Sequence, residues 1–364
     1  MRTVTAVAPA KLIVMGEHAV VYQRPALTAA IDLWLRVTIA PRRKSGVGLH
    51  LVELDHREQT DWASIRAYTD TVRDRWRRYV DHPTPEAFAH MRGDDPAHLV
   101  KVALGEAARR RPGVDLPAMD VTVRTQQPIG AGFGSSAAVA VAVVQALLAT
   151  QAVEMDDEAL RELILDVERR QHGTPSGVDP ATVLRGGLVW AERMNDALEY
   201  RSVTPRSPIL DGFRVLHTGM PAESTGTVVD AVRALRADDV DSFRACLDRI
   251  ETATRALRSL LAQDVEDSDE TVHLVRQVES ELEALGVVPE PVQSIIRSIE
   301  ERGGAAKISG AGSLSGSNAG PLLVYHPDPK FEVGTEFGSF TELDVQLGAK
   351  GAYIEREGET TTAD

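Results

Sequence analysis

The residues best suited to chemistry gather in a few short segments, and the first is a glycine-rich loop. It reads Gly130-Ala131-Gly132-Phe133-Gly134-Ser135-Ser136 and stands between a strand-like segment and a long apolar one. Glycines let a backbone approach a ligand closely, and the free N–H groups at a helix start attract a phosphate. The hydroxyls of Ser135 and Ser136 are suited to meet a phosphate oxygen or Mg²⁺. The loop therefore indicates either a phosphate site or a plain turn with a serine as helix cap.

The spacing of this loop excludes two common phosphate-binding motifs. A P-loop ends in Gly-Lys-Ser/Thr, and no lysine occurs here. A dinucleotide fingerprint needs its third glycine where Ser135 stands. The loop therefore belongs to neither class.

Asp179 is the single carboxylate in a run of turn-forming residues from His172 to Pro180. Such a carboxylate can serve as a base or as an electrostatic partner for a hydroxyl nucleophile. The alternative is structural, because aspartate is a common helix N-cap and proline a common first helical residue.

Lys11 is unusual because it stands within an apolar, strand-like segment of a chain with few lysines. Only six of the 40 basic residues are lysines. A buried ammonium needs an acidic partner, and Asp179 is a candidate. The alternative is a lysine at a strand edge with its ammonium in water. His18, taken alone, is more typical of a structural histidine than of a ligand.

Glu168 lies four residues before His172, at the edge of an apolar stripe. This place fits a carboxylate that binds a metal, and it also fits an ordinary exposed helix residue. A second glycine-rich loop begins at Gly310, Ala311 and Gly312. Its backbone N–H groups indicate either a site or a flexible turn.

Hydrophobic periodicity predicts the elements that must position these segments. Short strands are expected at 3–8, 12–15, 33–40 and 119–123, a hairpin at 187–200, and further strands at 213–216, around Lys307 and at 321–325. A helix buried on all sides is expected at 136–152, a second helix carries Glu168, and four more lie near 226–236, 239–262, 270–285 and 291–302. The charged segment 41–115 is predicted to be mostly helical, with no chemistry assigned to it. The last ten residues are polar and are expected to fray.

Composition limits the class of protein. The chain has 364 residues, 43% of them hydrophobic and 26% charged, which is typical of a folded protein of two domains. Its net charge of −14 disfavours nucleic acid and anionic membranes as partners, so an anionic ligand needs a local site. Cys246 is the only cysteine; it is expected in the core and fits a reduced cytoplasmic protein. No export signal is expected, and the glycines of the uncharged stretch 126–153 favour a buried helix over a membrane span.

The order of these segments resembles the GHMP kinase superfamily, and within it the members that act on mevalonate. The resemblance rests on Gly16-Glu17-His18-Ala19-Val20-Val21, on the loop at 130–138 and on His172 through Asp179. Thr218-Gly219, followed by Thr225 and Val228, is similar to the beginning of the family's second domain. The segment 41–115 carries no part of the resemblance.

The resemblance implies an α+β, two-domain GHMP kinase fold with the site between the domains. Residues 1–205 would form an N-terminal, ribosomal-protein-like α/β domain with the ATP-binding loop. Residues 206–364 would form a C-terminal, ferredoxin-like domain. The breaks at Pro205 and Pro208 place the boundary.

The resemblance also implies roles for single residues. Asp179 would act as the base, and Lys11 would pair with it and polarise the acceptor hydroxyl. Residues 130–136 would hold the phosphates of ATP, and Ser136 and Glu168 would hold Mg²⁺. The residues near the acceptor would be Glu17, His18, Thr225, Gly310 and Ala311.

The implied activity is ATP-dependent phosphorylation of mevalonate to 5-phosphomevalonate. Mevalonate and ATP would be its partners and Mg²⁺ its cofactor, with no nucleic acid, no membrane, and a homodimer left open. A catalytically silent metabolite sensor with the same fold is the alternative of another class. The presence of Lys11, Glu168 and Asp179 together favours the enzyme.

One motif departs from the family pattern. The family's third motif usually reads Gly-Ala-Gly-Gly-Gly-Gly, whereas here Gly312 is followed by Ser313, Leu314 and Ser315. A Cβ at these positions restricts both φ and the close approach of a ligand. Phosphomevalonate or another small alcohol is therefore the alternative acceptor.

Overall fold

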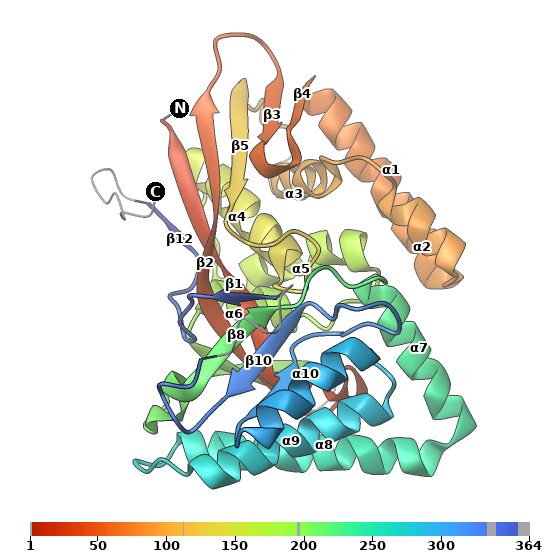
Figure 1. Cartoon of the computed structure of the whole chain (residues 1–364). Coiled ribbons are helices and arrows are strands. Elements are labelled where there is room, and N and C mark those ends of the chain that lie inside the picture. Colours follow the sequence, from red (N-terminus) through yellow and green to blue (C-terminus); the bar gives the residue numbers. More distant parts are fainter. Residues whose placement is uncertain (1, 112, 195–196, 333–339, 356–364) are drawn as a thin grey trace.

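The computed structural model describes residues 2–111, 113–194, 197–332 and 340–355, and it contains two β-sheets with helices packed on them (Figure 1). The architecture is α+β, as predicted. None of the helices in this part of the chain combines the length and apolar character that crossing a membrane requires.

The larger sheet carries the N-terminal half of the chain. Its strands run in the order β12-β1-β2-β5-β3-β4, and β6 and β7 extend it from the other end of β2. Among the described strands of this sheet, β3 and β5 pair in parallel and the other pairs are antiparallel. The strands are β1 (Val4–Met15), β2 (Ala26–Pro41), β3 (Val47–Leu51), β4 (His56–Thr60), β5 (Met119–Thr125), β6 (Leu188–Met194), β7 (Ala197–Val203) and β12 (Tyr353–Ile354).

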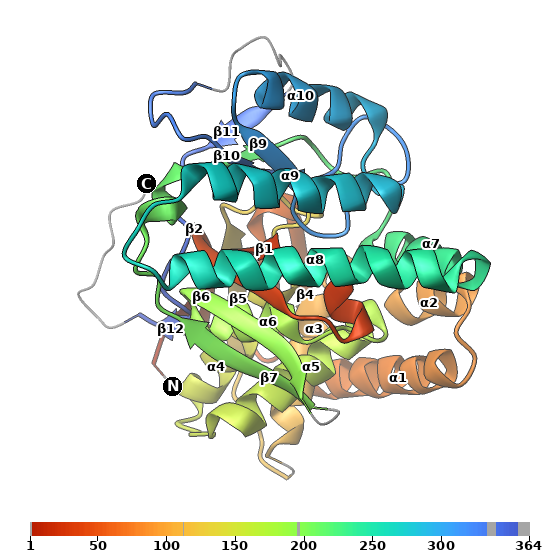
Figure 2. The same cartoon turned by 90° about the horizontal axis from the view of Figure 1, so that it is seen from below.

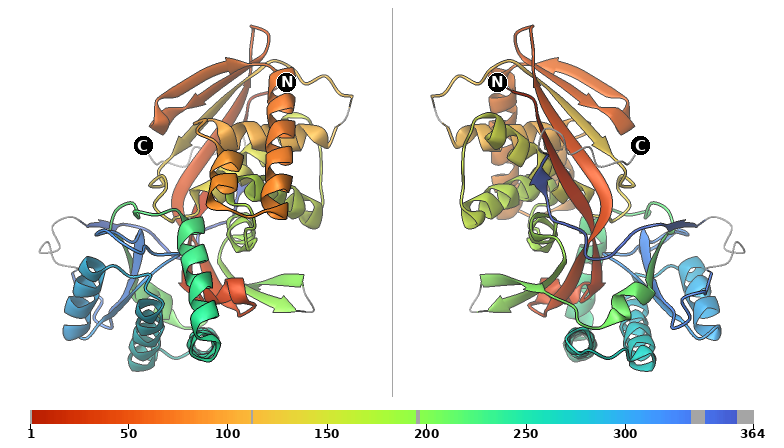
Figure 3. Two further views of the ribbon diagram at one scale, coloured as in Figure 1. Left: turned by 90° about the vertical axis from the view of Figure 1, so that its right-hand side faces the viewer. Right: turned by 90° about the vertical axis from the view of Figure 1, so that its left-hand side faces the viewer.

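The helices α1 to α5 lie on one face of the larger sheet, as the two views of Figure 3 show. Helix α4 is central: it packs on β1, β2, α3 and α5, and its small apolar residues are buried nearly all round, as predicted. The helices of this half are α1 (Trp62–Asp81), α2 (Pro85–Arg92), α3 (His98–Arg109), α4 (Ser135–Thr150), α5 (Asp157–His172) and α6 (Val178–Arg185).

The smaller sheet has the strand order β11-β8-β10-β9. Its strands are β8 (Phe213–His217), β9 (Ala305–Ile308), β10 (Pro321–Tyr325) and β11 (Thr341–Leu343). The helices of this half are α7 (Thr225–Asp238), α8 (Val240–Leu261), α9 (Ser268–Ala284) and α10 (Glu290–Glu301). Figure 2 shows α8, α9 and α10 side by side, and the buried Cys246 lies on α8. All four helices were predicted.

The prediction for 41–115 is wrong in part, because residues 47–51 and 56–60 form the strands β3 and β4. The sequence of β4, His-Arg-Glu-Gln-Thr, is polar because this strand lies at the sheet edge, where charged side chains are common. The two short strands expected at 3–8 and 12–15 are one strand, β1. A shift in register after Pro9 accommodates the missing N–H of the proline.

The last described residues return to the larger sheet. Strand β12 pairs with β1 through Ala6–Ile354 and Val7–Tyr353. The division of the chain at residues 205 and 206 stays a prediction. The prediction of a frayed tail falls on residues 355–364, of which 356–364 lie outside the described residues.

Candidate active site

The glycine-rich loop connects β5 to α4 and turns through glycines in the left-handed region. The φ angles are 72° at Gly130, 88° at Gly132 and 74° at Gly134. Gly134 is the N-cap of α4, and no side chain caps the helix, so the alternative of a serine cap is wrong. Because a helix leaves its first amides without intrahelical acceptors, the N–H groups of residues 135–137 are available to a ligand.

The loop packs directly on Lys11 of β1. The Lys11 N–H donates to the carbonyl of Phe133 at 2.9 Å. A Cβ on Gly134 would lie only 2.6 Å from Lys11 Cγ, which is closer than real Cβ atoms come. Glycine at this position therefore lets the start of α4 pack in direct contact with the aliphatic part of Lys11.

Lys11 and Asp179 form the ion pair that the sequence suggested. Their Nζ and Oδ1 atoms lie 3.0 Å apart, and the side chain of Lys11 is only 5% exposed. A lysine with its ammonium in water is therefore excluded. The N-cap of α6 is Gly177 and not Asp179, so the capping alternative is also wrong. The Asp179 side chain is 33% exposed, which leaves it accessible to a small molecule.

Glu168, Ser136 and His172 meet beside this pair. Ser136 Oγ lies 2.9 Å from His172 Nε2, and that nitrogen lies 3.8 Å from Glu168 Oε2. Burial, together with the charge of Asp179, raises the pKa of Glu168 to about 8. Burial lowers the pKa of His172 to about 4, so the imidazole is neutral near pH 7. An ordinary exposed position for Glu168 is wrong.

Glu168 and Ser136 fit a hard divalent cation. The Glu168 side chain is 2% exposed, and within the described part of the chain its buried Oε1 atom has no hydrogen-bond partner. Carboxylate and hydroxyl oxygens are the ligands that Mg²⁺ prefers, and a cation would favour the ionised carboxylate that burial opposes.

Segment 41–115 contributes to the site by supporting the 172–179 loop. The indole N–H of Trp76, on α1, donates to the carbonyl of Gly173 at 2.8 Å. The ring of Tyr79 lies so close to Gly173 that a Cβ there would be 2.3 Å from Tyr79 Cε1. No local sequence pattern indicates this role, because it arises from contact between distant segments.

A second buried ion pair was not predicted. Lys307 of β9 pairs with Glu17, and neither side chain is exposed at all. Burial raises the pKa of Glu17, while the charge of Lys307 opposes this shift. Glu279 of α9 lies in the same cluster, accepts a hydrogen bond from Ile308 N–H at 3.0 Å, and has its pKa raised well above the usual value by burial. The signal in the sequence was a rare lysine in the apolar segment 305–308.

The other residues predicted near the acceptor include His18 and Ala311, which lie on the loops that follow β1 and β9. His18 Nε2 lies 2.9 Å from the carbonyl of Ala311, and burial lowers the pKa of His18. The Ser309 hydroxyl donates to Ile13 O and accepts from Ile13 N–H, both at 2.9 Å. These bonds hold the loop after β9 against β1.

Gly310 lies across from the glycine-rich loop, since its Cβ would be 3.9 Å from the carbonyl of Gly132. Thr225 is the exposed first residue of α7, and among the described residues no hydrogen bond joins it to Lys11 or Asp179. The acceptor roles of these residues stay predictions.

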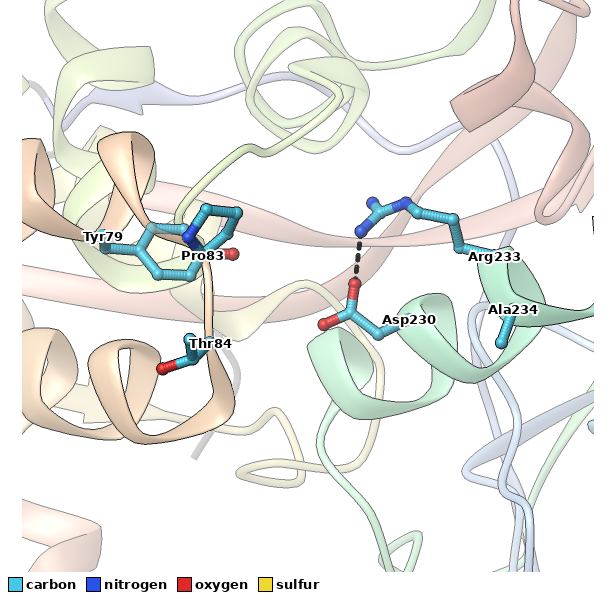
Figure 4. A pocket seen from close by; sticks show the side chains of 6 residues that line it. All are labelled: Tyr79, Pro83, Thr84, Asp230, Arg233 and Ala234. Carbon is cyan, nitrogen blue, oxygen red and sulfur yellow. Dashed lines mark hydrogen bonds and ion pairs between the residues drawn. The ribbon is translucent and has the colours of Figure 1, made fainter. Parts of the chain in front are cut away.

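Two hollows on the surface are lined by none of the predicted site residues. One of about 380 Å³ lies over β3, β4 and β5. The other, of about 300 Å³, lies between α1–α2 and α7, and Figure 4 shows its lining of Tyr79, Pro83, Thr84, Asp230, Arg233 and Ala234. Asp230 and Arg233 form an ion pair of 2.5 Å there, so their charges balance each other.

Comparison with known proteins identifies the family. A sequence model of the GHMP kinases N terminal domain matches residues 98–187. The mevalonate kinase of Archaeoglobus fulgidus is 30% identical over 306 residues, which cover 84% of this chain and 88% of that protein. The mevalonate kinase of Thermococcus onnurineus is 28% identical, with 97% and 98% covered. The chain belongs to the GHMP kinase family.

Solved structures agree with the fold. The mevalonate kinase of Methanococcus jannaschii superposes with a TM-score of 0.74 at 18% identity, covering 94% of this chain and 98% of that one. Streptococcus pneumoniae phosphomevalonate kinase, in complex with phosphomevalonate and AMPPNP, gives 0.68 at 17% identity, with 95% and 100% covered.

The buried Glu17–Lys307 pair predicts that removal of one partner alone strongly lowers the unfolding free energy of the protein. Lys307→Met leaves a fully buried carboxylate without its cation, which costs about 3–5 kcal/mol of unfolding free energy. In the double variant Glu17→Gln/Lys307→Met no buried charge is stranded by the change, so we expect it to be more stable than Lys307→Met alone. Denaturant unfolding measures both, with the exposed Lys330→Met as the matched control, expected within about 0.5 kcal/mol of the parent. A Lys307→Met variant as stable as the parent would contradict this account.

Glu168 predicts a pH dependence of stability in the protein free of nucleotide and divalent cations. Below pH 4.5 the carboxyl is protonated in both the folded and the unfolded chain. Between pH 4.5 and about 8 only the folded chain keeps this proton, so its contribution to stability declines as the pH rises. Glu168→Gln removes this loss.

We therefore expect the Glu168→Gln variant to exceed the parent in unfolding free energy at pH 9 by more than about 1 kcal/mol, and by much less at pH 4. Glu162→Gln, at a 47% exposed position of the same helix, is the control and should show no such pH-dependent gain. An equal effect of Glu168→Gln at both pH values would rule out a buried, proton-binding carboxyl.

Proposed function

We propose that this chain transfers the γ-phosphoryl group of ATP to the hydroxyl of mevalonate, giving 5-phosphomevalonate. The observation that carries the proposal is the Lys11–Asp179 pair, which lies beside Glu168 and Ser136 at the amide-rich start of α4. The named relatives over nearly the whole chain are mevalonate kinases, which supports mevalonate as the acceptor.

Asp179 would receive the proton of the acceptor hydroxyl. Its carboxylate is partly exposed, whereas Lys11 is almost completely enclosed. The Lys11 ammonium then faces the oxygen as negative charge develops on it. Phosphoryl transfer depends mainly on positioning and on charge stabilisation, and this pair supplies both.

The donor side would be formed by the loop at 130–136. Its left-handed glycines allow close backbone approach, and the N–H groups at the start of α4 would bind the phosphates. Ser136 and Glu168 would hold Mg²⁺, which supplies charge neutralisation on the phosphate oxygens when it is bound.

The acceptor side would be formed by His18, Gly310, Ala311 and Thr225. Glu17 is enclosed with Lys307, so its contribution would be to position the His18 segment and not to touch the acceptor. The two-domain division at residues 205 and 206 is part of the proposal and is supported by the two sheets, each with its own helices.

Phosphomevalonate is the second candidate acceptor. The sequence leaves it open, because Ser313, Leu314 and Ser315 stand where the family pattern has glycines, but the same residues bind the carboxylate of Glu223, which weighs against a more anionic acceptor. A silent metabolite sensor is less well supported, because the Lys11–Asp179 pair and the buried Glu168 are groups that phosphoryl transfer would use and that ligand sensing does not need.

The test is ADP release by the purified full chain with Mg-ATP and four acceptors: mevalonate, 5-phosphomevalonate, galactose and homoserine. We expect turnover with mevalonate that exceeds the rate with each of the others. Turnover with 5-phosphomevalonate alone would reassign the acceptor. Binding of ATP and mevalonate by calorimetry without any ADP release would favour the sensor.

A further inference from the structure

The residues that depart from the family's third motif bind a carboxylate of the chain itself. Ser313 Oγ and Leu314 N–H both donate to Glu223 Oε2, at 2.5 and 3.0 Å. Ser315 Oγ donates to Glu223 Oε1 at 2.5 Å. Both oxygens of the carboxylate are therefore bound by the loop that follows β9.

This contact is built into the fold and is not a chance meeting of surface side chains. Ser313 is fully buried, and its N–H donates to Val287 O at 2.9 Å. Its hydroxyl also accepts from Ala222 N–H at 3.2 Å. Nearby, Thr218 Oγ1 donates to Gly320 O at 2.8 Å. Segments 218–223 and 313–320 thus hold each other at several points.

The bound carboxylate carries a negative charge. Partial burial opposes ionisation, but the hydrogen bonds from Ser313, Ser315 and Leu314 N–H outweigh it and lower the pKa of Glu223. The same three donors are thereby used up. A ligand that approaches the loop meets a fixed negative charge and finds these donors already occupied.

The contact lies next to the predicted acceptor residues. Ser313 lies two residues after Ala311, whose carbonyl bonds to His18. Glu223 lies two residues before Thr225. Met220, on the segment that carries Glu223, reaches the glycine-rich loop, since a Cβ on Gly130 would lie 3.5 Å from Met220 Cε. The charge of Glu223 is therefore placed at the border of the proposed acceptor site.

We propose that Glu223 is a specificity-determining residue, whose carboxylate takes up three hydrogen-bond donors of the loop 313–315 and disfavours acceptors that carry an additional phosphate. This inference rests on the proposed function. A phosphate monoester adds about −1.5 to −2 charges near pH 7, so an acceptor that bears one is repelled more strongly than a simple carboxylate. The serines that replace glycines in the third loop are then the residues that hold this charge in place.

The test compares the binding of two acceptors to four full-length proteins. Calorimetry with a non-hydrolysable ATP analogue and Mg²⁺ gives the Kd of mevalonate and of 5-phosphomevalonate for the parent, Glu223→Gln, Ser315→Ala and Glu154→Gln. Glu154 is an exposed residue beyond the far end of α4, about 24 Å from the glycine-rich loop at 1.5 Å per helical residue. It controls for the removal of one negative charge.

In Glu223→Gln we expect the Kd of 5-phosphomevalonate to fall about ten-fold while that of mevalonate changes less than about three-fold, because removing the charge relieves the more anionic ligand most. Ser315→Ala loses one hydrogen bond and keeps the charge, so it should keep most of the discrimination. Glu154→Gln should bind both acceptors as the parent does.

The inference is overturned if Glu223→Gln binds 5-phosphomevalonate no more tightly than the parent, or if Ser315→Ala loses discrimination to the same extent as Glu223→Gln. The second result would mean that loop structure, and not charge, selects the acceptor. ADP release by the parent reports separately on the proposed function. If the parent turns over mevalonate but Glu223→Gln leaves the ratio of the two Kd values unchanged, only the proposed role of Glu223 is rejected.

Discussion

The ion pair of Lys11 and Asp179 is the interaction on which the rest of the site depends. An ammonium that is almost completely enclosed is costly unless a carboxylate balances it. This requirement fixes α6 so that Asp179 faces β1. It also requires glycine at position 134, because a Cβ there would displace the lysine stem. The glycine-rich loop and the 172–179 loop therefore meet at one lysine, next to the amides at the start of α4.

The N-terminal and C-terminal halves of the chain are joined close to β1 and the glycine-rich loop. Lys307 forms an ion pair with Glu17, and the hydroxyl of Ser309 donates to the backbone of Ile13. The carbonyl of Ala311 forms a hydrogen bond with the ring of His18. Each contact joins residues that are about 290 positions apart in the chain. A buried ion pair of this kind strongly penalises any arrangement that separates its partners. The proposed acceptor residues thus lie on a junction that is fixed by charge as well as by apolar packing.

Local patterns in the sequence predicted much of the fold and part of the candidate site. The apolar residues at 136–152 indicated a buried helix, and the stripe Val292, Ile295, Ile296 and Ile299 indicated α10. The rarity of lysine pointed to the Lys11–Asp179 pair. Strand β4 was missed because its polar residues suit an exposed edge as well as a helix surface. The pairs Glu17–Lys307 and Glu223–Ser313 were missed because they join distant segments, and no local pattern encodes such contacts.

The most direct test of the central claim is the coupling between Lys11 and Asp179, measured as the single-turnover rate of phosphoryl transfer to mevalonate. Removal of a catalytic base slows such a reaction by about 10²–10⁴-fold. If the two residues act as one unit, Lys11→Met, Asp179→Asn and the double variant should all be slow, and the double variant should be no slower than the slower single variant. ATP binding should persist in all three. Effects that multiply in the double variant, or near-parental turnover by Asp179→Asn, would contradict the account.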